Sequence, residues 1–317
     1  MIPVYRSLEE IPAGFGPVVA AIGNFDGVHC GHRKILGAVA AEARERGLRA
    51  IAVTFDPHPE QFLRPDQAPK MITPNSERLL LLAETGIDAV AVLRFDAALM
   101  NLPARSFVAD VLVRGLQVKG LHEGSNFRFG CRAQAGVSEL TEFGLEFGFH
   151  LTVHQPVRVH GLEVSSSAVR EFVAMGDLKY ARWMLGRPFV VRSTPISDRG
   201  IGSKLVVPTV NLAPYEGLLP ATGVYVTRLS IADRQFQAVT NVGNRPTFEN
   251  AGFSVETHIL NFEPIELTTE TPLELEFLYR LRPEIKFPSP QDLRAQIMRD
   301  VARAQRYFRL LQRIHLT

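Results

Sequence analysis

The side chains most suited to chemistry stand in one glycine-rich segment, Gly23-Asn24-Phe25-Asp26-Gly27-Val28-His29-Cys30-Gly31-His32. An apolar run typical of a buried strand ends at Gly23, and apolar residues recur at helical spacing after His32. The N–H groups and positive dipole end of a helix N-terminus favour an anion, and two imidazoles can donate hydrogen bonds to phosphate oxygens. Two histidines at such a junction are often incidental, but here the strand, the glycine turn and the helix agree. The segment therefore predicts a phosphate-binding site.

A second cluster of hydroxyl and basic side chains lies far along the chain, in Val164-Ser165-Ser166-Ser167-Ala168-Val169-Arg170. Three hydroxyls at a predicted helix start, with Arg170 within the next turn or two, can form a second phosphate cradle. Capping of the helix needs only one of the serines, and Arg170 alone is equally typical of a solvated surface charge. The two clusters together predict a site that holds a triphosphate at both ends.

The elements that must position these clusters alternate between strands and helices in the first half of the chain. Apolar runs predict the strands, and apolar residues at helical spacing predict the helices between them. The strands are Pro17–Ile22, Arg49–Phe55, Ala89–Arg94 and segments near Val118 and Leu151–Val153, and the helices are His32–Arg46, Ser76–Thr85 and Ala104–Arg114. This order favours an α/β domain with a parallel sheet, in which ligands bind beyond the carboxyl ends of the strands.

The second half of the chain has a different pattern. A predicted helix over Asp177–Arg187 closes the first domain, and short β-rich runs separated by turns follow it, which favours a small antiparallel barrel or sandwich. The runs are Phe189–Arg192, Gly223–Ile231, Gln237–Val242, Ser254–Asn261 and Leu273–Leu281. An amphipathic helix from Gln291 to about Arg313 ends the sequence. We therefore expect two domains, residues 1–186 and residues 187–317.

Composition limits the kinds of partner. The 317 residues include 35 basic and 33 acidic side chains, so the formal net charge is only +2. This balance argues against a polybasic binder of nucleic acid or membrane surfaces but leaves room for a local anion site. Cys30 and Cys131 lack metal-ligand spacing, and the sequence shows neither a signal peptide nor an apolar run of membrane-spanning length. We expect a cytoplasmic protein with small-molecule partners, and the sequence carries no signal for an oligomeric state.

The two clusters together resemble those of the prokaryotic bifunctional riboflavin kinase/FAD synthetase family. Three further segments fall in the family's order, and the resemblance covers nearly the whole chain. They are Thr54-Phe55-Asp56-Pro57-His58-Pro59, Ser106-Phe107-Val108-Ala109-Asp110-Val111-Leu112-Val113 and Gly124-Ser125-Asn126-Phe127-Arg128-Phe129-Gly130. Pantetheine-phosphate and nicotinamide-nucleotide adenylyltransferases share the H-x-G-H element but lack the D-P-H-P and N-F-R-F-G segments and this C-terminal domain.

The resemblance implies a Rossmann-like nucleotidyltransferase domain that transfers the AMP part of ATP to FMN, giving FAD and pyrophosphate. His29 and His32 would contact the transferring phosphate, and Arg170 would hold the β- and γ-phosphates with two serines. The implied nucleotide-binding residues are Gly23, Asn24, Phe25, Asp26, Gly31, Ser166 and Ser167, and the implied flavin-binding residues are Phe55, His58, Asn126, Phe127 and Arg128. Many family members carry Asp where Asn126 stands. For Phe129, packing in the core is the favoured interpretation.

The C-terminal half resembles the riboflavin kinase module, a six-stranded antiparallel barrel with a C-terminal helix that phosphorylates riboflavin. The resemblance implies that Thr209 and Asn211 bind Mg²⁺ and ATP, that Glu256 is the general base and that Arg282 binds flavin. Hydroxyl and amide oxygens suit a hard cation. Without the resemblance, Glu256 would read as a strand residue facing water.

One segment departs from the family pattern. In the family, a glycine-rich basic flap normally precedes the P-T-x-N segment. In this chain four flap positions depart from that pattern and carry Asp198, Ser203, Val206 and Val207. A β-branched valine does not readily adopt the positive φ that glycine allows. Three hypotheses therefore stay open: a bifunctional enzyme that converts riboflavin to FMN and FAD, a monofunctional FMN adenylyltransferase with an inactive kinase-like domain, and a non-catalytic flavin-binding regulator. The intact histidines, serines and Arg170 argue against the regulator.

Overall fold

A computed structural model describes residues 2–196, 209–244, 253–261 and 267–314, and the chain divides into two compact units, Met1–Ser166 and Ser167–Thr317. Residues 2–166 of the first unit, which are all described, are built on a six-stranded parallel sheet of order β1-β4-β3-β2-β5-β6. The strands are β1 (Val4–Tyr5), β2 (Val18–Ile22), β3 (Arg49–Asp56), β4 (Ala89–Arg94), β5 (Val118–Gly124) and β6 (His150–His154). All neighbouring pairs in this sheet run parallel.

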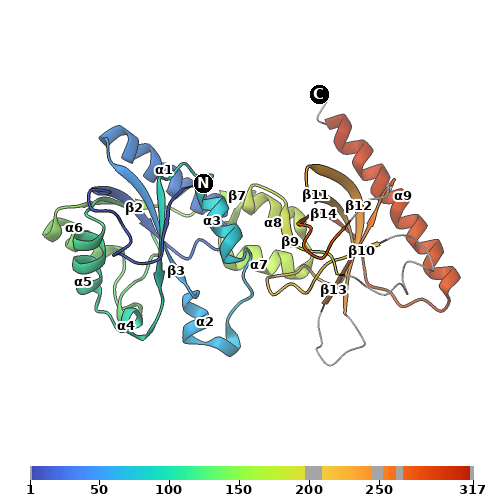
Figure 1. The fold of residues 1–317 in the computed structure, drawn as a ribbon, viewed down its shortest axis with the longest axis horizontal. Helices are drawn as coiled ribbons and strands as arrows, with labels where there is room; N and C mark the ends of the chain where they lie inside the picture. The colour runs from blue at the N-terminus through green and yellow to red at the C-terminus, as the bar shows by residue number, and fades with distance from the viewer. Residues whose placement is uncertain (1, 197–208, 245–252, 262–266, 315–317) are drawn as a thin grey trace. The chain divides into compact units, whose positions relative to one another are not determined.

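Helices cover both faces of this sheet, as Figure 1 shows. The strands carry near-continuous Val, Ile and Ala because both of their faces are buried. In β3, for example, Ile51 and Val53 enter one core cluster while Ala50 and Ala52 enter the other. The covering helices are α1 (Cys30–Arg46) and α3 (Asn75–Ala83) on one side, and α5 (Ala104–Ser106), its π-helical continuation Phe107–Gly115 and α6 (Val137–Phe147) on the other.

Short elements complete the first unit. They are the helices α2 (Pro59–Leu63) and α4 (Ala97–Met100), the 3₁₀ turns Pro65–Gln67 and Cys131–Ala133, and the small hairpin of β7 (Arg158–Val159) and β8 (Leu162–Glu163). Helix α1 ends at Gly47, whose φ of 65° suits a left-handed C-terminal cap. The predicted strands and the helices of α1, α3 and the Ala104–Arg114 region are confirmed, with small shifts at their ends.

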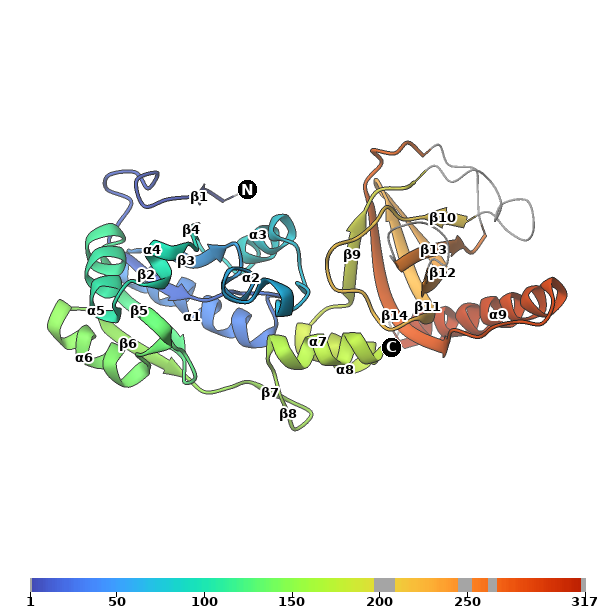
Figure 2. The same cartoon turned by 90° about the horizontal axis from the view of Figure 1, so that it is seen from below.

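The described residues of the second unit form a six-stranded antiparallel barrel, preceded by α7 (Ser166–Met175) and α8 (Leu178–Leu185) and followed by α9 (Pro290–Ile314). Its described strands follow the order β10-β13-β12-β11-β14-β9, and the curl of the sheet can be followed in Figure 2. They are β9 (Phe189–Ser193), β10 (Thr209–Asn211), β11 (Gly223–Ile231), β12 (Arg234–Asn244), β13 (Phe253–Ile259) and β14 (Leu273–Pro283).

A bridge between the two edges of this sheet closes the barrel. Pro195, just after β9, pairs with Leu212, just after β10. The N–H of Ile196 donates to the Asn211 carbonyl at 2.9 Å, and the N–H of Ala213 donates to the Thr194 carbonyl at 2.8 Å. Closure satisfies backbone groups that an open edge would expose. The predicted order of a parallel-sheet unit, a small antiparallel barrel and a C-terminal helix is confirmed.

Packing contacts and a backbone hydrogen bond join the flanking helices to the barrel. Helix α8 packs on β9 and β14, and the N–H of Ala221 donates to the Val173 carbonyl of α7 at 3.3 Å. On the other side, Ala304 and Phe308 of α9 are buried in a cluster with strand residues. The predicted domain boundary at residues 186 and 187 lies after α8, so it stays a prediction for the functional domains. Among the described helices, none combines the length and the apolar character needed to cross a bilayer.

Candidate active sites

The turn after β2 is held in place by a buried carboxylate. Asp26 is 1% exposed, and its two oxygens accept hydrogen bonds from the backbone N–H groups of Ile72 and Thr73, both at 3.0 Å. The Thr73 hydroxyl in turn accepts the Gly27 N–H at 3.0 Å. Because these contacts span the turn and a distant loop, Asp26 orders the backbone of the predicted nucleotide site.

The two histidines of the first motif stack on each other at the start of α1. Their ring centroids are 3.6 Å apart, and His29 Nδ1 accepts the backbone N–H of His32 at 3.3 Å, which makes His29 the N-cap. A Cβ on Gly31 would lie 3.1 Å from the His29 ring, so glycine allows this close approach. Burial, with His29 as a second cause, lowers the pKa of His32 well below 6.5. His32 is therefore a neutral hydrogen-bonding group near pH 7.

A cavity of about 280 Å³ opens at the carboxyl ends of β2 and β5. Six predicted phosphate-site residues contribute to its lining, together with side chains that the sequence did not single out. The predicted group is Gly23, Phe25, His29, Gly31, His32 and Ser166, and the additional group includes Lys34, Glu123 and His154. The Ser166 hydroxyl donates to the Asp26 carbonyl at 2.9 Å, which brings the start of the second motif against the first. Ser167 and Arg170 continue helix α7 in the second unit, so their phosphate contacts stay predictions.

Glu123 places a buried carboxyl group beside this cavity. The residue is 3% exposed, and one of its oxygens accepts the backbone N–H of Ile22 at 2.7 Å. Burial raises the pKa of Glu123 well above 4.5, although the hydrogen bond from Ile22 opposes this shift. A protonated carboxyl group carries no charge that would repel a phosphate, so the raised pKa is compatible with an anion in the cavity.

The raised pKa predicts a pH dependence of stability that Glu123→Gln removes. In the unfolded chain the carboxyl group ionises near pH 4.5, whereas the folded protein keeps the proton to a higher pH. Its contribution to stability is therefore fully present below about pH 4.5 and is lost as pH rises through the folded pKa, by up to about 1.4 kcal/mol per pH unit. Glutamine cannot ionise and keeps an oxygen for the Ile22 N–H.

Urea unfolding of both proteins at a series of pH values, followed by circular dichroism, measures this difference. The stability of Glu123→Gln relative to the wild type is expected to increase with pH above 4.5. A difference that stays constant with pH would mean that the Glu123 carboxyl group ionises alike in the folded and unfolded states.

A larger cavity of about 860 Å³ shares Gly23, Asn126 and Phe127 with the smaller one. Its lining also includes the predicted flavin residues Phe55 and Arg128 and apolar side chains such as Phe95 and Leu99, which suits a flat aromatic ligand. Phe129 also borders it but is only 7% exposed and packs between Phe107 and Phe127, in agreement with the core interpretation.

His58 does not line either of these two cavities. It is 6% exposed and is the N-cap of α2, where its Nδ1 accepts the Glu60 N–H at 3.2 Å. The Gln61 side chain accepts the His58 N–H at 3.2 Å, which completes a capping box. These contacts are structural, and flavin binding by this side chain stays a prediction.

Arg78 is a buried residue that the sequence analysis missed. Its two terminal nitrogens donate to the carbonyl oxygens of Asn24 at 2.7 Å and Phe55 at 3.0 Å, so it joins the ends of β2 and β3 through two residues that line the larger cavity. Burial lowers the pKa of Arg78, and the charges of Asp26 and Asp56 oppose this shift. An arginine in a helical N-S-E-R-L pattern gives no signal in the sequence that distinguishes it from a surface charge.

The barrel brings the predicted kinase residues into register. On β10 and β13, Asn211 lies directly opposite Glu256 and Thr209 lies opposite His258. Directly opposed residues face the same side of a sheet. The alternate pair, Val210 and Thr257, is buried, so Thr209, Asn211 and Glu256 share the outward face. The structure thus gathers three oxygen-bearing side chains at one place on the barrel.

Arg282 is engaged by a residue that the sequence analysis did not consider. Its Nε lies 2.8 Å from Oδ2 of Asp300, which is 1% exposed on α9, and its guanidinium lies 5.6 Å from the centroid of the Phe287 ring. This ion pair ties α9 to β14, and the predicted flavin contact of Arg282 stays a prediction. The altered flap positions Asp198, Ser203, Val206 and Val207 lie outside the described residues.

Comparisons with known proteins cover both units. Residues 13–168 match the family model for FAD synthetase, and residues 185–308 match that for riboflavin kinase. Bifunctional riboflavin kinase/FMN adenylyltransferases of Escherichia coli and Pseudomonas fluorescens are each 35% identical, covering 92% of this chain and 93% of the relative in the first case, and 95% and 96% in the second. A solved structure described as a macrolide-efflux protein from Streptococcus pneumoniae matches with a TM-score of 0.86 and 25% identity, over 95% of this chain and 98% of that one.

Proposed function

The chain belongs to the family of bacterial bifunctional riboflavin kinase/FMN adenylyltransferases, and on that premise we propose which of its residues carry each reaction. It is an enzyme of FAD biosynthesis: ATP phosphorylates riboflavin to FMN, and adenylyl transfer from a second ATP to FMN gives FAD and pyrophosphate. The adenylyl transfer belongs to residues 1–186 and the kinase to residues 187–317. We further propose a cytoplasmic location, since the chain's two cysteines do not make a disulfide framework and a reducing compartment fits such a chain.

In adenylyl transfer, an FMN phosphate oxygen forms a bond to the α-phosphorus of ATP while the bond to pyrophosphate breaks. No nucleophile of the protein is required, so positioning and charge stabilisation carry the catalysis. His29 and His32 donate hydrogen bonds to the phosphate in transfer, and Lys34 adds a positive charge to the same cavity. Ser166, Ser167 and Arg170 hold the departing phosphates.

The larger cavity is the place for the flavin of FMN. Phe55 and Phe127 offer ring surfaces, and Asn126 and Arg128 offer polar groups at its edge. Because both cavities share Gly23, Asn126 and Phe127, a flavin in the larger cavity can extend its phosphate toward the stacked histidines. This shared lining is the observation that best supports the assignment of the two cavities.

In the kinase, Glu256 is the general base that takes the proton from the ribityl 5′-hydroxyl as that oxygen attacks the γ-phosphorus of ATP. Thr209 and Asn211 are the residues that would hold Mg²⁺, because hydroxyl and amide oxygens are donors that this ion accepts and both lie on the face that carries Glu256. When bound, Mg²⁺ neutralises phosphate charge. These side chains orient the phosphates of ATP next to the base.

A flavin assay tests both activities together. The purified full-length protein is incubated with Mg²⁺ and ATP and with either riboflavin or FMN, and the flavins are separated by chromatography. FMN and FAD from riboflavin, and FAD with pyrophosphate from FMN, are the expected products. FAD from FMN alone would contradict the kinase assignment and identify the barrel as an inactive module. Flavin binding without consumption of ATP would contradict both activity assignments and favour the hypothesis of a non-catalytic flavin-binding regulator.

A further inference from the structure

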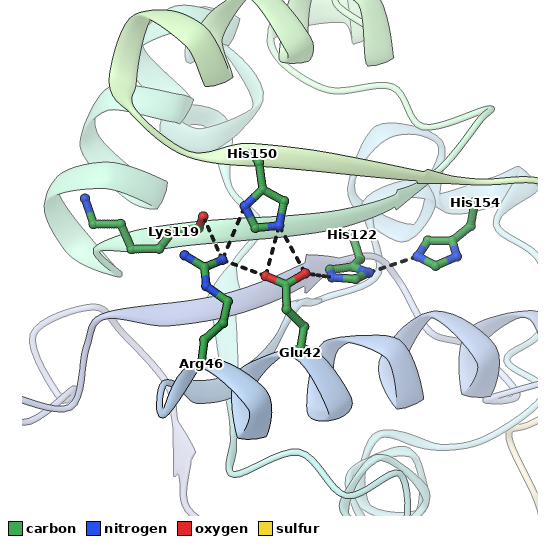
Figure 3. A network of polar contacts seen from close by, with 6 residues as sticks. All are labelled: Glu42, Arg46, Lys119, His122, His150 and His154. Atoms are coloured by element: carbon green, nitrogen blue, oxygen red, sulfur yellow. Dashed lines mark hydrogen bonds and ion pairs between the residues drawn. The ribbon is translucent and has the colours of Figure 1, made fainter.

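Two histidines and a glutamate converge on one side of the first unit, at a place that neither reaction uses. Glu42 comes from α1, His122 from β5 and His150 from β6, as Figure 3 shows. His122 Nε2 lies 2.8 Å from Glu42 Oε2, and His150 Nε2 lies 2.9 Å from Glu42 Oε1. One nitrogen of each imidazole and one carboxylate oxygen lie within 4.8 Å of one another. Three ligand atoms at this spacing can bind a single ion.

The backbone leaves room for this convergence at Gly120, which pairs with His150 across β5 and β6. A Cβ at Gly120 would lie 2.5 Å from Glu42 Oε1 and 2.8 Å from His150 Cε1. Both distances are shorter than contacts that real Cβ atoms make, so a side chain at this position would push the glutamate and the histidine apart. The glycine therefore keeps the three donors together.

The surroundings also suit a bound cation. The Glu42 side chain is only 19% exposed, and its carboxylate lies against the two imidazoles and against the Arg46 guanidinium, which is 2.7 Å from Oε1, so it already faces a positively charged group. The other ring nitrogen of His122, Nδ1, lies 3.0 Å from His154 Nε2. An imidazole that binds a metal through one nitrogen usually donates its second N–H to a neighbour, and His154 stands where that acceptor is needed (Figure 3).

We propose that Glu42, His122 and His150 form a binding site for a divalent transition-metal ion, with Zn²⁺ as the best fit. Two imidazoles and one carboxylate are a ligand set that Zn²⁺ accepts, whereas Mg²⁺ and Ca²⁺ prefer oxygen ligands alone. The His122 side chain is 5% exposed and that of His150 is 47% exposed, so the ion can enter from the solvent on the His150 side and keep a water as a fourth ligand.

Arg46 competes with the ion for the same carboxylate. Its guanidinium lies 2.7 Å from Glu42 Oε1 and 3.2 Å from His150 Nδ1. The side chain is 37% exposed, so it can swing into solvent when an ion binds. Removal of this positive charge should therefore strengthen metal binding, an effect opposite to that of removing a ligand.

Calorimetric titration of the metal-stripped full-length protein with ZnCl₂ tests the site. The wild type is expected to bind Zn²⁺ at this site. Glu42→Gln and His150→Ala should each weaken binding by at least about 10-fold, and Arg46→Ala should strengthen it. His160→Ala, which removes an exposed histidine outside the cluster, is the control and should bind like the wild type. A hundredfold excess of free Zn²⁺ over the Kd should raise the Tm of the wild type by about 5–10 °C, and that of Glu42→Gln far less.

Two ligand substitutions are tested so that a folding defect in one of them does not decide the result. His150 is half exposed and tolerates truncation better than a buried residue. Zinc binding that survives both Glu42→Gln and His150→Ala would place the ion elsewhere and overturn the proposal. A wild type that binds no Zn²⁺ would identify the cluster as an ion-pair network without a metal. An Arg46→Ala protein that binds no more tightly would contradict the competition between Arg46 and the ion.

Discussion

Exchange of His29 for asparagine is expected to lower the rate of FAD formation from FMN by about 10²- to 10³-fold, the usual effect of losing one hydrogen bond to a transition state. The shorter asparagine side chain cannot place an N–H where the imidazole Nε2 lies. The reason lies in the cavity, where the imidazole stands with His32 at the start of α1. Phosphorylation of riboflavin by the same protein should be unchanged, because the kinase residues belong to the barrel. Initial rates of both reactions, measured by chromatography of the flavins, check this result.

Asparagine separates the chemical role of His29 from its structural one. His29 is the N-cap of α1, and an asparagine side chain can accept the same backbone N–H, whereas alanine cannot. His29→Ala should therefore lose about 1 kcal/mol of stability in addition to activity, and His29→Asn should lose activity alone. If the asparagine variant forms FAD at the wild-type rate, the imidazole does not act on the phosphate, and the residue serves the helix only.

The order of strands and helices in the first unit was predictable because buried parallel strands consist of unbroken apolar runs. The observed β2, Val18–Ile22, lies within one residue of the predicted strand. Helix α6 (Val137–Phe147) was missed. It contains Gly144, and glycine disfavours a helix. A Cβ at Gly144 would lie only 2.7 Å from the Phe149 carbonyl oxygen, so the close approach of this carbonyl needs a glycine. The turn that ends this helix thus requires a residue that helix propensity disfavours.

The candidate site was predictable where function depends on a motif and unpredictable where it depends on burial. The strand, turn and histidines of the first motif, with Ser166 of the second, line one cavity. Arg78 and Glu123 were missed because charged residues are mostly exposed, and only the three-dimensional fold shows that these two are buried. His58 shows that a motif residue can also have a structural role, since its side chain caps α2 while its predicted flavin contact stays a prediction.

Exchange of Glu256 for glutamine is expected to lower FMN formation from riboflavin by about 10²- to 10⁴-fold, the range for loss of a general base. Glutamine keeps the size of the side chain but cannot take the proton of the ribityl hydroxyl. The conversion of supplied FMN to FAD should be unchanged. Because Glu256 is exposed on β13, the substitution should change the free energy of unfolding by no more than about 0.5 kcal/mol.

The matched control is Glu276→Gln, which replaces a carboxylate of the same barrel whose partner is Arg228, at 2.9 Å. It should leave both reactions intact, so that an effect of Glu256→Gln reflects position and not the loss of any charge from the barrel. Wild-type kinase activity in Glu256→Gln would remove this residue from the reaction and leave Thr209 and Asn211 beside a base that has yet to be identified. Loss of both reactions in that variant would instead make Glu256 a structural residue, since an acid–base role confined to the barrel cannot affect adenylyl transfer to FMN.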